Sequence, residues 1–265
     1  MLISSSFPLN YQAGKWHLTK LVSSQLDQYK KILLITAGFH GDEPAGPISL
    51  RQMLPEIIDR AEKKGIGLIV YPLINPSGFE RRSRYNVNNE KPNNDFLRYR
   101  LDDGRLIDDL GNSDKFSTWH WSSDLTLKLK LPVETKLLHH LLRSDPLARV
   151  VAVIDLHQDN ITSSGPLTYH YVFGERQRYN NIIDNIESHV PLAKYRLISA
   201  GFNSELPAPK TDGRGFITRH DGSLADLLWR LGVAHAVTVE TTTATPLTTA
   251  IEINRLWITR LIDIL

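Results

Sequence analysis

Cysteine is absent from the 265-residue sequence. Its absence excludes a disulfide framework, a thiolate metal site and a cysteine nucleophile. No apolar run approaches the ~18 residues that a membrane span requires. The first residues, Met1–Pro8, lack the basic start and the long apolar stretch of a secretory signal, so we expect a cytoplasmic protein.

An excess of charge of either sign is also missing. The sequence has 31 basic and 29 acidic residues and a formal net charge of +2. This balance gives no indication of binding to nucleic acid or to a membrane surface. Hydrophobic residues, in contrast, make up 41% of the chain. That content is enough for one large α/β core, and we expect a single domain over residues 1–265.

Short apolar runs alternate with helical patterns along the chain. The expected strands are 31–37, 66–72, 149–156, 195–199 and 234–240, and the expected helices are 44–63, 133–144, 176–189, 223–231 and 247–263. This alternation predicts a sheet with helices on both faces. Residues 75–124 and 200–222 read as two long loops, and we expect both to wall a site at the strand ends.

Two of the expected strands deliver a histidine at their carboxyl ends. His40 and Glu43 follow the run 31–37 on a glycine-flanked turn, and His157 follows the run 149–156. Ligands bind at this end of the strands in open α/β sheets. Two histidines and one carboxylate leave a fourth position free, which is the ligand set of a catalytic zinc. The alternatives are a loop histidine that caps a helix, for His40, and a satisfied core histidine, for His157.

Other polar residues lie near these strand ends. Asp155 shares a strand face with His157 and could orient the His157 ring through a hydrogen bond. Glu240 closes the run 234–240, where a carboxylate is costly unless it is paired or functional. It could also cap the threonine-rich turn that follows. His139 and His140 are adjacent on an expected helix, so their side chains do not meet at one point and we interpret them as structural.

The order of these residues resembles that of the zinc carboxypeptidase family. The matching elements run from residue 31 to about residue 245: His40-x-x-Glu43, Asn75-Pro-Ser-Gly78, Arg84, an asparagine-rich segment ending at Phe96, Asp155-Leu-His157, Asp221-Gly-Ser-Leu and Thr238-Val-Glu240. The resemblance implies a single-domain α/β/α sandwich around a mixed, mostly parallel sheet. The spacing from Arg84 to Asn93 is similar to that of the aspartoacylase and succinylglutamate desuccinylase branch.

The resemblance also implies roles for individual residues. His40, Glu43 and His157 would bind one zinc ion per chain, and Glu240 would be the general base. Arg84 would polarise the scissile carbonyl group. Asn93 would contact the terminal carboxylate of the substrate.

The sequence departs from the family pattern at two places. Asn94 stands where the family places the arginine that clamps the substrate carboxylate, and Arg98 or Arg100 could replace it. Residues 200–240 contain no counterpart of the family's mobile tyrosine, and Tyr169 or Tyr171 could enter from another segment. Because an asparagine offers a carboxylate one neutral donor group, we expect reduced dependence on a free substrate carboxylate unless an arginine takes over.

The sequence therefore predicts a zinc-dependent metallocarboxypeptidase or peptide amidase that acts on a peptide or peptide-like substrate. The alternative is a deacylase of N-acyl amino acids, of the aspartoacylase or succinylglutamate desuccinylase kind. That branch usually carries a β domain after its glutamate, and here residues 241–265 follow Glu240, which favours the peptidase. A third alternative is a binding protein that has lost turnover. The oligomeric state is not predicted.

Overall fold

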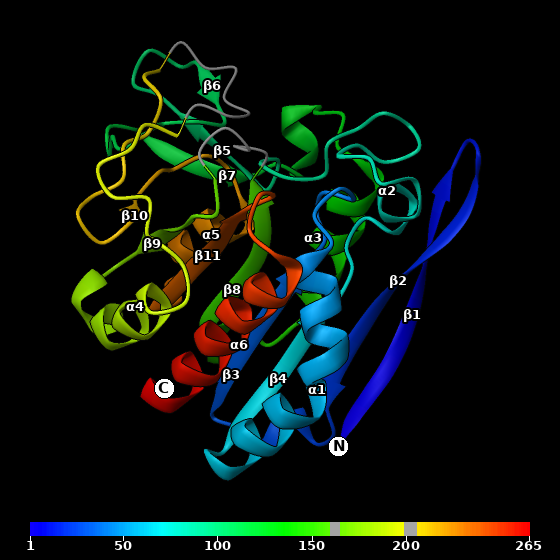
Figure 1. Ribbon diagram of the computed structural model, residues 1–265. Coiled ribbons are helices and arrows are strands. Elements are labelled where there is room, and N and C mark those ends of the chain that lie inside the picture. Colours follow the sequence, from blue (N-terminus) through cyan, green and yellow to red (C-terminus); the bar gives the residue numbers. More distant parts are fainter. Residues whose placement is uncertain (160–164, 199–205) are drawn as a thin grey trace.

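The computed structural model describes residues 1–159, 165–198 and 206–265. Its centre is an eight-stranded sheet (Figure 1). In spatial order the strands are β1 (Leu2–Tyr11), β2 (Gly14–Ser23), β4 (Ile66–Tyr71), β3 (Lys31–Ala37), β8 (Val150–Asp159), β11 (His235–Thr242), β9 (Thr168–Phe173) and β10 (Phe216–Ile217). The four strands β4, β3, β8 and β11 are mutually parallel, whereas β1, β2 and β9 join antiparallel to a neighbour. The mixed, mostly parallel sheet is therefore confirmed.

The parallel strands are apolar because both of their faces are covered. Along β3, Leu33 and Ile35 pack into one hydrophobic core, and Ile32 and Leu34 pack into the other. All six residues of β4 are buried as well. The alternation of side chains between two cores explains why these runs are almost continuously hydrophobic in the sequence.

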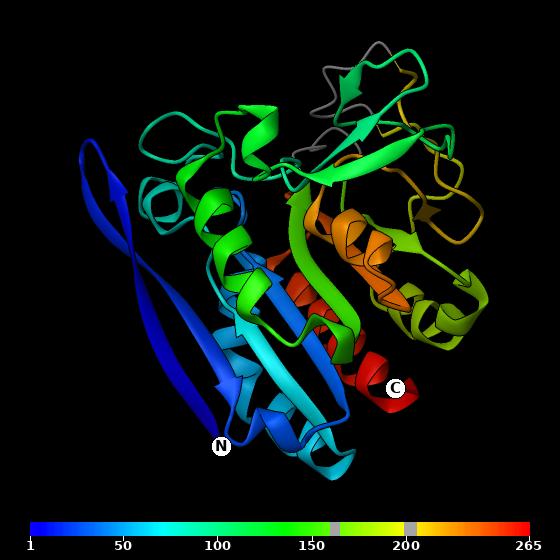
Figure 2. The same cartoon turned by 180° about the vertical axis from the view of Figure 1, so that it is seen from behind.

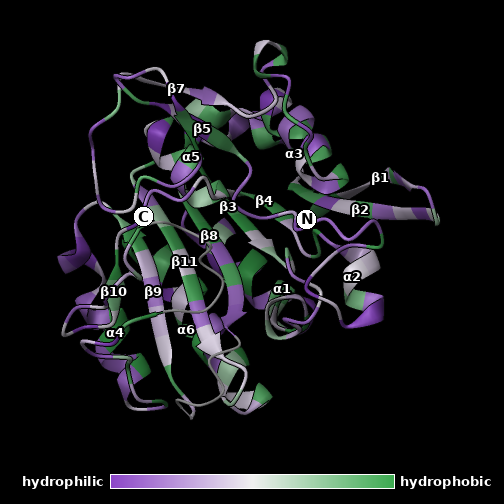
Figure 3. Ribbon diagram, turned by 90° about the horizontal axis from the view of Figure 1, so that it is seen from above, coloured by the Kyte–Doolittle hydropathy of each residue, from purple (hydrophilic) through white to green (hydrophobic). Residues whose placement is uncertain are grey.

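Helices form a layer on each face of the sheet. The first face is covered by α1 (Ala45–Lys63), α4 (Asn180–Glu187) and α6 (Leu247–Ile264). The second is covered by α3 (Val133–Ser144) and α5 (Leu224–Arg230), which lie in front of the sheet in Figure 2. In Figure 3, α3 and α4 carry both hydrophilic and hydrophobic residues, as helices with one buried face do. No helix of the described ranges is long and apolar enough to cross a membrane.

The remaining elements are short. They are α2 (Pro76–Arg81), a second sheet formed by β6 (Leu106–Ile107), β5 (Leu97–Arg100) and β7 (Thr118–Trp121), and the 3-10 helices η1 (Leu26–Gln28), η2 (Leu125–Leu127), η3 (Leu147–Arg149) and η5 (Arg176–Tyr179). The second sheet and α2 lie within 75–124, so that segment is more ordered than the expected long loop. The expected helix 176–189 is divided into η5 and α4.

The prediction of a strand at 195–199 was wrong for the residues that the structure describes. Residues 195–198 form a single bridge, between Leu197 and Lys210, and residue 199 lies outside the described ranges. Tyr195 has a φ of 54°, which is left-handed and breaks an extended run. The strands β9 and β10 of the main sheet were not predicted, although the Thr-Tyr-His-Tyr-Val-Phe composition of β9 is typical of strands. The hairpin of β1 and β2 was also missed.

Candidate active site

The histidine–glutamate turn and His157 meet because their strands are parallel neighbours. β3 pairs with β8 up to Ala37 and Leu156, so the carboxyl ends of both strands reach the same edge of the sheet. After β3, Gly38 adopts a φ of 71° and turns the chain back over this edge. The turn places His40 and Glu43 above the end of β8, where His157 lies.

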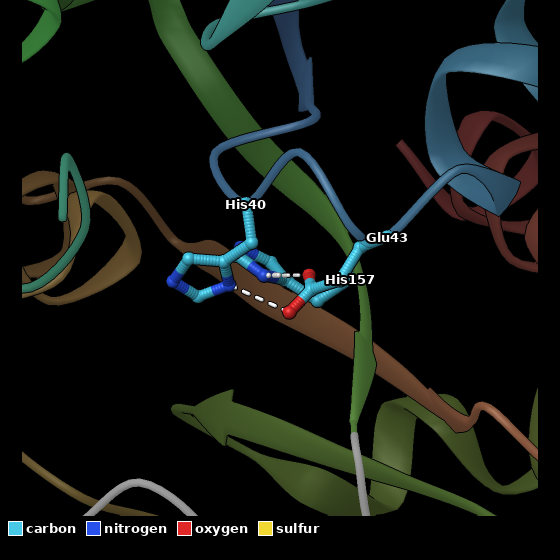
Figure 4. Close-up of side chains that lie close together, drawn as sticks. All are labelled: His40, Glu43 and His157. Carbon is cyan, nitrogen blue, oxygen red and sulfur yellow. Dashed lines mark hydrogen bonds and ion pairs between the residues drawn. The ribbon is translucent and has the colours of Figure 1, made fainter. Parts of the chain in front are cut away.

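These three side chains form a buried cluster (Figure 4). Each residue is only 2% exposed. Nδ1 of His40 is 2.6 Å from Oε1 of Glu43, and Nδ1 of His157 is 2.8 Å from Oε2 of the same carboxylate. One ligand atom from each residue lies within 4.8 Å of the others. The arrangement predicted from the sequence is thus present in space.

The cluster fits a divalent metal ion. Two imidazole nitrogens and one carboxylate oxygen are the donor set of a catalytic zinc, in which neighbouring ligand atoms are roughly 3.4 Å apart at bonds of about 2.1 Å. Nε2 of His157 lies 2.9 Å from Oδ2 of Asp155, and Oγ1 of Thr36 donates to Oδ1 of Asp155 at 2.8 Å. Asp155 therefore holds the Nε2 proton of His157 and leaves Nδ1 for an ion, as supporting carboxylates do in metal sites.

The electrostatics of the cluster favour a cation at its centre. Burial raises the pKa of Glu43, but His40 and His157 lower it by more, so the net pKa lies well below the usual range. Burial lowers the pKa of His157, but Asp155 and Glu43 raise it by more, so the net pKa lies well above 6.5. The pKa of His40 is lowered to about 4, chiefly by burial. The two carboxylates thus keep positive charge on His157, and a metal ion would take the place of that charge.

A backbone contact fixes the turn that carries His40. A Cβ atom added to Gly41 would lie 1.9 Å from the carbonyl carbon of Gly78, so the two chain segments touch directly. Asn75 joins the same segments, because its Nδ2 donates to the Phe39 carbonyl at 3.3 Å and its Oδ1 accepts from the Gly78 amide at 2.8 Å. The Asn75-Pro-Ser-Gly78 motif therefore positions the ligand turn.

Glu240 and Arg84 lie beside the cluster. Glu240 is on β11 and is directly opposite His157 in the parallel register of β8 and β11. Its Oε2 is buried and has no hydrogen-bond partner among the described residues. Burial raises the pKa of Glu240 well above 4.5, and the His157 charge opposes that rise. Arg84 donates from Nη1 to Oε1 of Glu43 at 2.9 Å, and its side chain is 27% exposed.

Segments from both expected loops line the pocket around these groups. The first contributes Lys91, Asn93 and Asn94, and the second contributes Arg219 and Asp221. The side chains of Ser223 and Thr238 also line the pocket. Lys91 was not predicted as a site residue, because no motif marks a single lysine in a polar segment.

The structure brings Asn93 and Asn94 to the pocket but does not bring Arg98 or Arg100 there. Asn94 donates from Nδ2 to Oδ2 of Asp221 at 2.8 Å. Arg98 lies outside the pocket lining and forms an ion pair with Asp95 at 2.5 Å. Arg100 donates to the Gly104 carbonyl at 3.3 Å on the exposed side of the second sheet. Neither arginine is therefore among the residues that line this pocket.

The two tyrosines named from the sequence reach the pocket on β9. Tyr169 is paired with Glu240 and Tyr171 with Thr238 in the antiparallel register of β9 and β11. Both line the pocket, and the Tyr169 hydroxyl donates to Asp159. They arrive from a strand that the sequence analysis did not predict. His139, in contrast, packs between Phe96 and Trp121 at centroid distances of 5.2 and 5.3 Å, away from the metal ligands.

Comparison with solved structures shows the same fold. A candidate metallopeptidase from Shewanella baltica OS155 is 23% identical, with a TM-score of 0.68 over 98% of this chain and 85% of that one. A metallo-carboxypeptidase from Burkholderia cenocepacia is 10% identical, with a TM-score of 0.58 over 98% of this chain and 64% of that one. A succinylglutamate desuccinylase/aspartoacylase from Rhodobacter sphaeroides is 15% identical, with a TM-score of 0.51 over 98% and 64%.

The curated proteins give no match to this sequence. Residues 29–184 match the profile of the succinylglutamate desuccinylase/aspartoacylase catalytic domain. This range is more than half of the chain and contains the metal-ligand cluster, Arg84 and the asparagines of the pocket wall. The match confirms the resemblance that the sequence motifs indicate. The chain is a hydrolase-type domain that belongs to the succinylglutamate desuccinylase/aspartoacylase family.

Proposed function

We propose that this protein is a zinc-dependent hydrolase that cleaves an amide bond in a peptide or peptide-like substrate. The observation that carries the proposal is the convergence of three groups in one pocket. These are the buried His40–Glu43–His157 cluster, the unpartnered carboxylate oxygen of Glu240 and the Arg84 guanidinium. Amide hydrolysis requires an activated water molecule, a proton acceptor and a stabiliser of negative charge, and these groups supply one of each.

The cluster would hold the metal ion through Nδ1 of His40, one oxygen of Glu43 and Nδ1 of His157. When bound there, zinc supplies a Lewis acid that polarises a carbonyl oxygen and lowers the pKa of water. Asp155 holds the His157 ring in the orientation and tautomer that this requires.

Glu240 is proposed as the general base. It lies across from His157 on the adjacent parallel strand, and its Oε2 makes no hydrogen bond within the described residues. This oxygen is available to accept a proton from the attacking water molecule. The same carboxyl group then delivers the proton to the leaving amine, so that one residue serves both halves of the reaction.

Arg84 is proposed to stabilise the negative charge that develops on the carbonyl oxygen. Its guanidinium contacts Glu43 and is partly exposed toward the pocket. A guanidinium has five N–H donors, so contact with Glu43 leaves other donors for the substrate oxygen. In a pocket that excludes bulk water, such a charged donor is more effective than it would be in solution.

The second candidate function is removal of the acyl group from an N-acyl amino acid. The family match over residues 29–184 favours it, because the family is named for such deacylases. The chemistry is the same, and the difference lies in what the pocket walls recognise on the two sides of the amide bond. The complete ligand cluster and Glu240 argue against a binding protein without turnover.

The experiment that separates these functions is an activity screen of purified protein. Chelated protein would be reloaded with zinc and offered unmodified peptides, cell-wall peptides and N-acyl amino acids. We expect zinc-dependent release of a new amine from a peptide substrate. Preferential release from N-acyl amino acids would favour the deacylase, and no release from any class by zinc-loaded protein would contradict hydrolysis altogether.

A further inference from the structure

Two arginines and one lysine line the pocket, and both arginines are engaged in ion pairs. Arg84 is paired with Glu43 at 2.9 Å. Arg219 is 2% exposed and donates from Nε and Nη2 to Oδ2 of Asp109, at 3.1 and 2.5 Å. Lys91 differs from both, because its ammonium group makes no hydrogen bond or ion pair with any residue of the described ranges. It is nonetheless partly buried and lines the pocket beside the metal ligands.

A partly buried ammonium group without an ion pair lowers the stability of the folded protein. Burial lowers the pKa of Lys91, and the Arg84 charge lowers it further, while Asp221, Glu43 and Asp95 raise it from a distance. None of these carboxylates makes a direct contact with Lys91. Partly buried charges are usually paired, so an unpaired one that faces a substrate pocket indicates a partner on the ligand.

The residues that could have neutralised Lys91 are committed elsewhere. Asp221 accepts from Nδ2 of Asn94 at 2.8 Å and from the Ser223 amide at 3.1 Å. Asp95 is paired with Arg98 at 2.5 Å. Glu43 is held by the metal-ligand cluster. The position is therefore open to an anion that arrives with the substrate.

The single charge of Lys91 is matched by an anion with a single negative charge. Glu43, Asp221 and Glu240 line the same pocket, and they would repel a doubly charged phosphate group. A carboxylate matches one ammonium group in charge and forms a charge-assisted hydrogen bond with it. The substrates of amide hydrolysis carry carboxylates at chain ends, on acidic side chains and on acyl groups.

We propose that Lys91 binds a carboxylate of the substrate and thereby selects substrates with a free acid near the scissile amide. The inference rests on the proposed function and extends it to the substrate class. It assigns to Lys91 the role for which Arg98 and Arg100 were considered from the sequence. The expectation from Asn94 alone is the opposite, namely comparable cleavage of free acids and amides.

Paired substrates test this directly. The zinc-loaded enzyme would be given one N-acylated dipeptide as the free acid and as the C-terminal amide, and one N-acyl amino acid with its amide. A charge-assisted hydrogen bond predicts that kcat/KM favours the acid by about 10- to 100-fold. The pair that shows the preference identifies whether the carboxylate is that of a peptide end or of an acylated amino acid.

Variants then assign the preference to Lys91. In Lys91→Gln the acid and the amide should be cleaved with equal kcat/KM, and Lys91→Arg should retain most of the preference for the acid. The matched control is Lys130→Gln, because the Lys130 side chain is 91% exposed and its one ion pair, with Glu90, is long at 3.9 Å. Equal loss on both substrates in Lys91→Gln would make Lys91 structural and overturn the proposal, as would an unchanged preference.

A binding measurement separates this inference from the proposed function. N-acetylglycine and N-acetylglycinamide would be titrated into wild type and Lys91→Gln, with binding followed by ligand-observed NMR. Tighter binding of the acid, lost in the variant, supports Lys91 even if no substrate is cleaved. An equal response to acid and amide in wild type, including no response to either, overturns the assignment of Lys91 whatever the enzyme hydrolyses.

Discussion

The pocket has two halves that are built in different ways. The metal half comes from strands β3, β8 and β11 and the turn after β3. In it Asp155, His157, Glu43 and His40 bond to one another, and Oε2 of Glu240 has no partner among the described residues. The wall half comes from the segment before β5 and from the residues that precede α5. In the wall half, Oδ1 of Asn93 lacks a partner among the described residues, and the ammonium group of Lys91 makes no hydrogen bond or ion pair within them.

This difference assigns a separate task to each half. Groups that already bond to one another hold a fixed geometry, which a metal site requires. Groups without partners gain most when a ligand arrives, and so they discriminate between ligands. Changes in the metal half should therefore remove turnover on all substrates, whereas changes in the wall half should alter the choice of substrate.

Loss of a ligand in the metal half should have the largest effect. We expect His157→Ala to retain almost no zinc and no measurable activity, a loss greater than the ~10- to 100-fold that changes behind the ligands cause. Zinc per chain would be measured by atomic absorption after dialysis, with exposed His140→Ala as the control. Full zinc occupancy in folded His157→Ala would remove His157 from the ligand set.

Glu240→Gln separates binding from proton transfer within the metal half. The amide keeps the size of the side chain but cannot accept the proton, so zinc content should be unchanged while kcat falls by about 10²- to 10⁴-fold. Rates would be compared with those of Glu187→Gln, an exposed position on α4. Near-normal turnover in a zinc-loaded Glu240→Gln protein would exclude Glu240 as the general base.

Asp155→Asn tests the hydrogen bond that orients the His157 ring. It weakens the partner of Nε2 of His157, and we expect zinc affinity to fall by about 10- to 100-fold with the ligands still in place. Competition with a chromogenic chelator measures this change. Thr36→Val removes the donor to Asp155 and should cost less. If both variants bind zinc as wild type does, Asp155 has no influence on the site.

The smallest effect concerns an unpartnered group that no ligand can reach. Both ring nitrogens of His170 lack partners within the described residues, and the ring lies 4.9 Å from Trp257 in the core. Burial lowers the pKa of His170 to about 3. An unfolded histidine binds a proton below pH ~6.5, so the stability contributed by His170 is complete above that pH and is lost as pH falls, by about 1.4 kcal/mol per unit.

His170→Leu should remove this part of the pH dependence. Urea unfolding at pH 7 and pH 5.5 gives the free energy of unfolding for wild type and variant. The wild type should lose about 1 to 2 kcal/mol more than the variant between the two conditions. Exposed His140→Leu is the control. Parallel losses in wild type and His170→Leu would show that His170 takes up no proton on unfolding in this range.

The convergence of His40, Glu43 and His157 could be predicted from the sequence, whereas of the wall only its two segments and the asparagines Asn93 and Asn94 were predicted. His40 and His157 follow buried apolar runs, and parallel strands bring their ends to one edge whatever the details of packing. The wall depends on contacts between distant segments, such as that of Asn94 with Asp221, which leave no local pattern. For this reason the sequence suggested Arg98, which pairs with Asp95 outside the pocket lining, and gave no indication of Lys91.

The same distinction applies to the fold. The central strands β3, β4, β8 and β11 were predicted because burial on both faces makes them continuously apolar. The hairpin of β1 and β2 has one exposed strand with three consecutive serines, Ser4 to Ser6, so its pattern is weak. The run at Tyr195 was misread because its backbone conformation, and not its composition, ends the extended chain.

The contact between Gly41 and Gly78 has a consequence for metal uptake. The backbone of Gly41 lies directly against that of Gly78 and Phe79, so the His40 turn is held against α2. A ligand turn that is already in place loses little conformational freedom when the ion arrives. In the proposed metal site, little of the binding free energy would therefore be offset by ordering of the turn. A side chain at Gly41 would push the turn off α2, and an incoming ion would then have to order the turn as it binds.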